Sequence, residues 1–145
     1  DTARAQAAAE GLFGHEDRIA GLARAALGAD VVREAAGADR WRELYLAAPV
    51  DGVLLEGYLD LLVRTPEGLV VVDYKTGATS AEDADRRLVG YRTQGAAYAL
   101  LVEAALGEPV ARVVFLFLHD DGVFERELPD LVAAVAEVRG RLVAP

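Results

Sequence analysis

The spacing of hydrophobic positions changes along the chain from a helical to a strand pattern and back. Through the first 27 residues, apolar side chains recur every three or four positions in an alanine-rich background, as at Leu12, Ile19 and Leu22. This spacing predicts one or two helices. A short helix is expected to follow over residues 30–36, which makes residues 1–40 a helical N-terminal part.

Residues 43–75 carry three mainly apolar runs separated by turn residues. We expect strands over residues 43–50, 53–64 and 69–75. Asp51-Gly52 is a strong signal for a two-residue hairpin turn between the first two strands. Residues 65–68, Thr-Pro-Glu-Gly, are typical of a second turn. The three strands are therefore predicted to be antiparallel neighbours.

The second half of the chain predicts a helix, two strands and a final helix. A polar loop over residues 76–85 leads to a helix over 88–106, which ends at Gly107 and Pro109. Strands are expected over 110–118 and 123–128, and Pro129 opens a last helix that ends near Leu142. This order indicates one α/β domain over residues 1–145, with a core at 43–128 and a C-terminal helix within 129–145.

The composition is that of a globular domain, since 53% of the 145 residues are hydrophobic and 27% are charged. No apolar run is long enough to span a membrane, and there is no secretory signal pattern, so we expect a cytoplasmic protein without a membrane partner. Without cysteine, a metal site must use oxygen or imidazole ligands. No glycine-rich loop with a following lysine is present, which excludes a nucleotide-driven motor. The absence of methionine leads us to expect a fragment of a longer protein.

The charged residues are informative in two ways. The net charge of −9 disfavours nonspecific binding of nucleic acid by the whole surface, because phosphate binding needs Lys and Arg. A DNA-binding function then needs a partner domain or a local basic strip; Arg86, Arg87 and Arg92 near the start of the second-half helix either grip a DNA backbone or form a solvated face. Lys75 is the only lysine among the 15 basic residues. Arginine replaces lysine poorly where a compact ammonium must point at one atom, so we expect the chemistry of Lys75 to matter.

Asp60, Asp73 and Lys75 form the candidate reactive group. If residues 65–68 close an antiparallel pair, Asp60 and Asp73 lie directly opposite one another, with Cβ atoms about 5 Å apart. Lys75 then shares the face of Asp73. Two opposed carboxylates among leucines and valines are tolerable if a cation bridges them, if one is protonated, or if Lys75 neutralises them. Mg²⁺ or Mn²⁺ suits such oxygen ligands. The alternative is a buried salt bridge between Asp73 and Lys75, with Asp60 exposed to solvent.

Three motifs occur in order along this stretch: Gly57-Tyr58-Leu59-Asp60, Asp73-Tyr74-Lys75-Thr76-Gly77 and Gln94-Gly95-Ala96-Ala97-Tyr98. They resemble the G-x-x-D, D-x-K and Q-x-x-x-Y motifs of the RecB-family branch of PD-(D/E)xK nucleases. The resemblance covers roughly residues 43–128. It implies a restriction-endonuclease-like core in the order αβββαβ, with a mixed sheet flanked by helices, in agreement with the elements expected above.

The resemblance also implies catalytic roles for the motif residues. Asp60 and Asp73 would bind the metal, and the backbone carbonyl of Tyr74 would add a third oxygen. Lys75 would orient the attacking water or help to deprotonate it, and would stabilise charge on the phosphate. The metal would lower the pKa of the water and polarise the scissile phosphodiester.

Three more polar residues are expected near this group or in contact with DNA. Gln94 and Tyr98 are four residues apart, and they share one helix face with Tyr91. In the family this pair lies beside the lysine and the phosphate; an ordinary half-buried helix face is the alternative. Glu43 matches an acidic residue of the family that contacts the lysine or a bound metal, and is otherwise a solvated strand-edge glutamate.

The family also uses a histidine, from a G-x-x-x-H motif on its first helix, to complete the metal site. Residues 11–15 have this spacing and end at His15. However, Gly14 disfavours a helix, and Arg18 stands where the family has an apolar residue. We therefore expect the family histidine upstream of residue 1, and His119 to be a surface residue.

These residues, with the resemblance, predict a divalent-metal-dependent deoxyribonuclease of the exonuclease type. The resemblance implies the C-terminal nuclease module of a helicase–nuclease of the RecB, AddA and AdnAB type, which processes DNA double-strand ends for recombinational repair. Its expected partners are DNA, helicase domains of the same polypeptide and a second helicase–nuclease subunit. One alternative is a catalytically incomplete nuclease fold that guides DNA or serves in subunit docking. Another is an unrelated α/β binding domain with an acidic patch.

Overall fold

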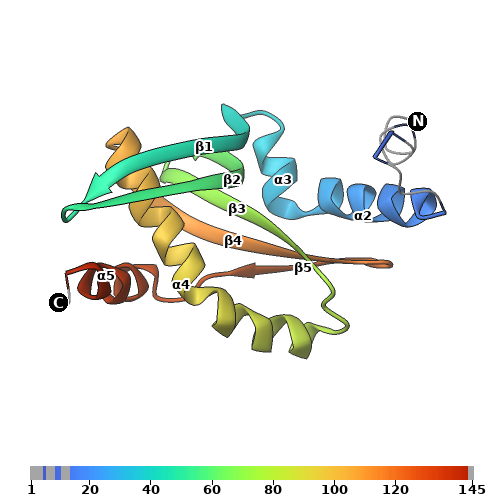
Figure 1. The fold of residues 1–145 in the computed structure, drawn as a ribbon. Helices are drawn as coiled ribbons and strands as arrows, with labels where there is room; N and C mark the ends of the chain where they lie inside the picture. The colour runs from blue at the N-terminus through green and yellow to red at the C-terminus, as the bar shows by residue number, and fades with distance from the viewer. Residues whose placement is uncertain (1–4, 6–8, 11–13, 144–145) are drawn as a thin grey trace.

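The computed structural model describes residues 5, 9–10 and 14–143. Its centre is a five-stranded sheet in the order β1-β2-β3-β4-β5 (Figure 1). β1 (Arg40–Val50), β2 (Val53–Thr65) and β3 (Gly68–Thr76) are antiparallel neighbours. β4 (Val110–His119) runs parallel to β3, and β5 (Gly122–Glu127) returns antiparallel to β4. The predicted mixed sheet is therefore confirmed.

Helices cover both faces of this sheet (Figure 1). α4 (Ala81–Leu106) crosses one face, with α5 (Leu131–Leu142) packed beside it. α2 (Glu16–Gly28) and α3 (Asp30–Ala35) pack on the other face. Two hydrophobic layers result. The α4 layer includes Leu59, Leu62, Val71, Ala96, Leu100 and Phe115. The α3 layer includes Val31, Leu61, Val63, Val72, Val114 and Leu116.

β3 and β4 occupy the middle of the sheet because both of their faces are apolar. Val70, Val71 and Val72 are each at most 1% exposed, and residues 113–117 of β4 are equally buried. Continuous apolar runs of this kind are typical of strands that are covered on both sides. β3 therefore presents Asp73 and Lys75 near the carboxyl end of a rigid, buried strand.

One helix is longer than its hydrophobic pattern predicted. α4 begins at Ala81 rather than at residue 88, and the expected loop shortens to residues 77–80. Ser80 caps the helix, because its side chain accepts a hydrogen bond from the backbone N–H of Asp83. Five of the residues 81–87 are charged. The hydrophobic spacing in these first turns therefore gave no helical signal.

The other boundaries lie within three residues of those expected. β1 begins at Arg40 instead of residue 43, and the last helix begins at Leu131 instead of residue 129. Residues 11–13, part of the expected G-x-x-x-H motif, lie outside the described residues. Among the helices that the structure describes, none is both long and apolar enough to span a membrane.

Candidate active site

Asp60 lies where β2 separates from β3. The β2–β3 ladder has the expected register and ends with Leu61 opposite Val72. Asp60 and Asp73 are next in this predicted register, but β2 and β3 form no ladder pair at their level. Instead, Asp60 Oδ2 accepts a hydrogen bond from the backbone N–H of Tyr74 at 2.8 Å. The half-buried carboxylate is thus held against β3 at the end of the ladder.

Asp73 and Lys75, two positions apart on β3, form a buried ion pair. Lys75 Nζ lies 2.7 Å from Asp73 Oδ2, and the two side chains are 17% and 6% exposed, with Lys75 the more exposed of the two. Burial raises the pKa of Asp73, Lys75 lowers it, and the charge of Asp60 raises it. The salt bridge that the sequence left open as an alternative is therefore present. Asp60 is nevertheless close enough for its charge to raise the pKa of Asp73.

Aromatic rings restrain the Lys75 ammonium. Nζ lies 4.5 Å from the ring centroid of Tyr91 and 6.0 Å from that of Phe115. Tyr91 also stacks on Phe115, with ring centroids 5.5 Å apart. Lys75 is therefore held by a carboxylate and by two rings, one from α4 and one from β4.

Gln94 and Tyr98 interact with one another on α4. Gln94 Nε2 donates a hydrogen bond to Tyr98 Oη at 3.3 Å. Burial raises the pKa of Tyr98, and the charge of Asp73 raises it further, while Lys75 lowers it. The phenol therefore lies in the field of the ion pair. A Cβ at Gly57 would come within 3.3 Å of Tyr98 Cε1. The glycine of G-x-x-D thus leaves room for the tyrosine of Q-x-x-x-Y.

Two buried oxygens at this site have few donors among the described residues. Gln94 Oε1 has none, and Asp73 Oδ2 has the Lys75 ammonium at 2.7 Å. A buried oxygen without enough donors costs folding free energy, so it marks a place for a water molecule or a cation. Asp60 and Asp73 supply the hard oxygens that Mg²⁺ and Mn²⁺ bind. No group of three or more His, Cys, Asp or Glu forms a metal site within the described part of the chain. The donor set therefore fits an ion that keeps several waters or substrate oxygens.

Glu43 and His119 are the other residues considered from the sequence. Glu43 is exposed on β1 at the level of Asp60, and Lys75 pairs with Asp73. His119 is half-buried and stacks on Phe124, with ring centroids 4.4 Å apart, so it is less exposed than expected.

His15 lies near the carboxyl end of β3. It is exposed and immediately precedes α2, and it lines the same hollow as Thr76, the residue after Lys75. Gly14 has a φ of +84°, so the glycine that disfavours a helix lies just before the helix begins. The G-x-x-x-H spacing is the sequence signal for this residue, and Gly14 does not conflict with it.

The family model of the PD-(D/E)XK nuclease superfamily matches residues 2–143. The chain belongs to this superfamily. Two curated relatives, from Desulforamulus reducens and Pelotomaculum thermopropionicum, are each one subunit of an ATP-dependent helicase/nuclease. They are 38% identical over 79 residues and 37% identical over 78 residues, respectively. Each match covers 52% of this chain but 6% of the relative, so the chain spans a small part of their length.

A solved structure from Eubacterium rectale, described as a candidate exonuclease, has a similar fold. It matches with a TM-score of 0.56 and 19% identity, over 88% of this chain and 49% of that one. At this identity the likeness extends to the fold alone. It agrees with the mixed sheet and flanking helices of the nuclease domain.

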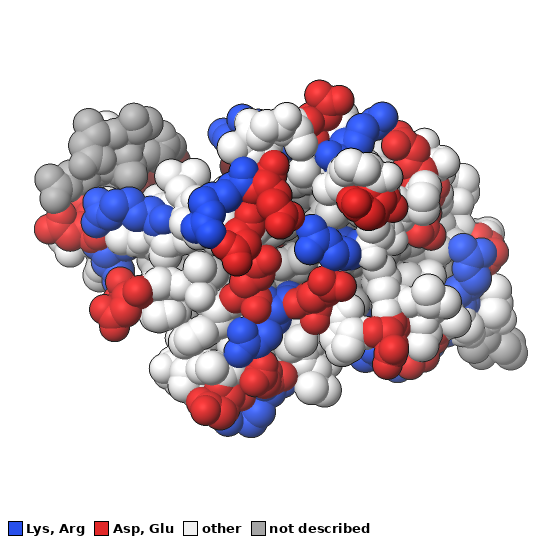
Figure 2. All heavy atoms as spheres, turned by 180° about the vertical axis from the view of Figure 1, so that it is seen from behind, with Lys and Arg blue, Asp and Glu red and all other residues white. Residues whose placement is uncertain are grey.

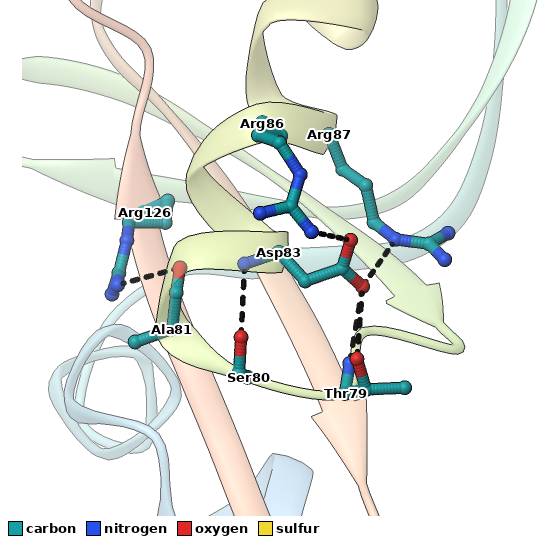
Figure 3. Close-up of polar contacts among 7 residues, drawn as sticks. All are labelled: Thr79, Ser80, Ala81, Asp83, Arg86, Arg87 and Arg126. Atoms are coloured by element: carbon teal, nitrogen blue, oxygen red, sulfur yellow. Dashed lines mark hydrogen bonds and ion pairs between the residues drawn. The ribbon is translucent and has the colours of Figure 1, made fainter.

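A cluster of charged side chains surrounds the N-terminus of α4 in this nuclease domain (Figure 3). Asp83 accepts hydrogen bonds from the backbone N–H of Thr79 and from Arg86 and Arg87. Arg87 makes this contact through Nε, and its Nη1 lies 3.9 Å from the position of a Cβ at Gly77. The Arg87 guanidinium is therefore anchored beside the loop that follows β3.

Other arginines of the domain are paired within the fold. Arg92 donates hydrogen bonds to Glu137 and to the backbone carbonyl of Pro129. Arg112 forms an ion pair with Glu34 at 3.1 Å. On the face opposite α4, acidic and basic side chains are interspersed (Figure 2). This face therefore offers no extended basic surface to DNA, in keeping with the net charge of −9.

Proposed function

We propose that this PD-(D/E)XK nuclease domain is a divalent-metal-dependent deoxyribonuclease that hydrolyses phosphodiester bonds. The observation that carries the proposal is the grouping of Asp60, Asp73 and Lys75 at the end of the β2–β3 ladder. One place combines two carboxylates, a restrained ammonium and a buried amide oxygen, Gln94 Oε1, that no donor of the described residues reaches.

Asp60 and Asp73 would hold Mg²⁺ or Mn²⁺, with the backbone carbonyl of Tyr74 as a third protein oxygen. When bound, the ion would lower the pKa of a water molecule and offset charge on the phosphodiester. Burial and the charge of Asp60 disfavour the ionised form of Asp73 in the metal-free site. A divalent ion would relieve this electrostatic penalty more strongly than Lys75 alone does.

Lys75 would act on the water or on a phosphate oxygen. The ion pair with Asp73 and the ring of Tyr91 keep its ammonium within one small region. With Asp73 holding the ion, the Lys75 ammonium would be free to direct its hydrogens at the reacting oxygens. No donor in the described part of the chain reaches Gln94 Oε1, so it would accept a hydrogen bond from the water. Tyr98 has a raised pKa and stays protonated at neutral pH, so it would donate to a phosphate oxygen.

DNA would approach along the carboxyl end of β3. Arg87 is anchored beside that loop, and its Nη atoms would pair with a backbone phosphate. Because the net charge is −9, most of the affinity for DNA would come from other domains. We assign that role to helicase domains of the same polypeptide and to a second helicase–nuclease subunit, by analogy with the ATP-dependent helicase/nuclease relatives. The domain would then act as an exonuclease in the cytoplasm, on double-strand ends during recombinational repair.

A non-catalytic role in DNA guidance or subunit docking is the second candidate. It is favoured by the small number of ligands: no three His, Cys, Asp or Glu side chains form a metal site within the described residues. One of the two carboxylates is also paired with Lys75. A domain of this kind would contact DNA without needing a divalent ion.

A cleavage assay separates the two functions. Linear and covalently closed duplex DNA of one sequence are incubated with the protein in Mg²⁺, Mn²⁺ or EDTA. We expect metal-dependent degradation of the linear DNA, resistance of the closed circle, and loss of cleavage in Asp73→Asn. DNA binding without cleavage by the wild type in either metal would overturn the nuclease and favour the second candidate.

A further inference from the structure

Side-chain alternation in β2 is reversed at Asp60. Side chains of a regular strand alternate between faces, so Leu59 and Leu62, three residues apart, should lie on opposite faces. Both belong to the α4 layer, whereas Leu61 belongs to the α3 layer. The alternation therefore changes phase between Leu59 and Leu61, at the level of Asp60.

β1 changes phase at the same level. Leu44 packs against the α4 layer, while Arg42, two residues away, lines a hollow with Leu61 on the α3 side. The β1–β2 register is the same before and after this level, but Glu43 and Asp60 themselves form no ladder pair. Because the side-chain alternation reverses in both strands at the same level, the β1–β2 register is unchanged and paired residues still share a face.

The backbone of Glu43 departs from strand geometry at this same level. Its φ is +49°, in the left-handed region that side-chain-bearing residues rarely adopt. One left-handed residue within a strand breaks the side-chain alternation, because the side chains before and after it no longer point to alternate faces in the regular order. The side chain of Glu43 is exposed and, within the described residues, has no ion-pair or hydrogen-bond partner. The feature that Glu43 contributes here is therefore its backbone conformation.

The change of phase also determines where the Asp60 carboxylate lies. The β2–β3 ladder stops at Leu61, the residue that follows Asp60 in the sequence. The Asp60 carboxylate accepts a hydrogen bond from the backbone N–H of Tyr74, beside Asp73. We propose that Glu43 is a positioning residue for Asp60, acting through its left-handed backbone and not through its own carboxylate. This role rests on the proposed function, in which Asp60 binds the divalent ion.

Substitutions at position 43 separate the backbone from the carboxylate. Glu43→Gln removes the charge alone. Glu43→Gly and Glu43→Asn also remove it, but adopt the left-handed conformation readily. Glu43→Val carries a β-branched side chain, which disfavours that conformation. The first readout is the rise in melting temperature caused by Mn²⁺, which reports metal affinity by mass action. The second is the hydrogen-exchange rate of the Tyr74 amide without metal.

The backbone role predicts a specific order among these variants. The Gln, Gly and Asn variants should keep the Mn²⁺ response and the slow exchange of the Tyr74 amide. Glu43→Val should exchange this amide faster, because its acceptor on Asp60 is displaced. Its apparent affinity for Mn²⁺ should fall by at least about tenfold, the low end for losing a residue that orients a metal ligand.

Asp51→Val is the matched control. Asp51 has the same φ of +49° and lies in the turn between β1 and β2, away from Asp60. The control should lower stability without changing the Mn²⁺-induced rise, which separates general strain in the hairpin from the position of Asp60.

Two results would overturn the inference: loss of the Mn²⁺ response in Glu43→Gln, or an unchanged response and Tyr74 exchange rate in a folded Glu43→Val. If Glu43→Val does not fold, the Gly and Gln variants still decide whether the carboxylate is needed. A wild type without any Mn²⁺-dependent rise would contradict the proposed function instead. In that case the Tyr74 exchange rates still test whether Glu43 positions Asp60.

Discussion

The Asp60 carboxylate accepts a hydrogen bond from the backbone N–H of Tyr74 at 2.8 Å. A side-chain oxygen of β2 thereby takes the role of a strand carbonyl at the point where β2 leaves β3. The charge of the same carboxylate also raises the pKa of Asp73. Asp60 therefore both closes the ladder and concentrates negative charge where a divalent ion is proposed to bind.

Substitution of Asp60 separates these two effects. Asp60→Ala leaves the Tyr74 N–H without its acceptor, and should lower the free energy of unfolding by about 1–3 kcal/mol. Asp60→Asn keeps an oxygen acceptor and removes the like charge, so the loss should be under about 1 kcal/mol. Urea unfolding at neutral pH without metal measures both variants. Equal losses in the two variants would contradict a stabilising role for this hydrogen bond.

The raised pKa of Asp73 predicts the pH dependence of stability. Burial raises this pKa above its ordinary value of 3.8, so the folded protein binds the proton more tightly than the unfolded chain does. The stability contributed by the proton is present below pH 3.8 and is lost as the pH rises through the folded-state pKa. Asp73→Asn mimics the protonated carboxyl. The metal-free wild type should therefore lose free energy of unfolding relative to this variant over that window. If the free energy of unfolding of the wild type instead rose relative to that of Asp73→Asn with rising pH, the assignment of a raised pKa to Asp73 would be contradicted.

Lys75→Arg tests the lone lysine. The Lys75 ammonium fits between the Asp73 carboxylate, 2.7 Å away, and the Tyr91 ring, 4.5 Å away. A planar guanidinium is bulkier and cannot point a compact charge at one oxygen. We expect the variant to fold and bind DNA, while metal-dependent cleavage falls by at least about tenfold. Cleavage within about twofold of the wild type, less than the loss of a positioned catalytic group costs, would remove Lys75 from the mechanism.

Arg87 is expected to contact DNA, and Arg92 provides its control. Arg87 is anchored through Nε beside Gly77, whereas Arg92 is bonded to Glu137 and Pro129. Arg87→Ala should weaken DNA binding and reduce the slope of log affinity against log salt by about 1, as for one lost phosphate contact. Arg92→Ala should leave that slope unchanged. Fluorescence anisotropy titrations over a range of salt measure both, and identical slopes in the two variants would rule out a specific contact by Arg87.

Much of the fold could be predicted because strong turn residues and doubly buried strands dominate it. The turns at residues 51–52 and 65–68 determine the register of both hairpins, and this register put Asp73 and Lys75 beside Asp60. The start of α4 could not be read from hydrophobic spacing. Its first turns are held by the Ser80 cap and by hydrogen bonds to Asp83, not by burial of an apolar stripe.

The detailed geometry of the site was less predictable, since strand alternation was taken to be constant. Glu43 has a left-handed backbone, and glutamate gives no sequence signal for it, whereas Gly or Asn at that position would have. The change of phase at Asp60 was therefore invisible in the sequence. The Asp73–Lys75 ion pair, by contrast, was one of the two arrangements that their spacing on β3 allowed.

Binding of a divalent ion between Asp60 and Asp73 underlies the proposed mechanism. Diffraction from a crystal grown with Mn²⁺, measured at the manganese absorption edge, tests it directly, because anomalous scattering locates the ion. We predict a peak within about 2.0–2.6 Å of a carboxylate oxygen from each of the two residues. A peak elsewhere, or no peak and two carboxylates that point apart, would contradict the mechanism.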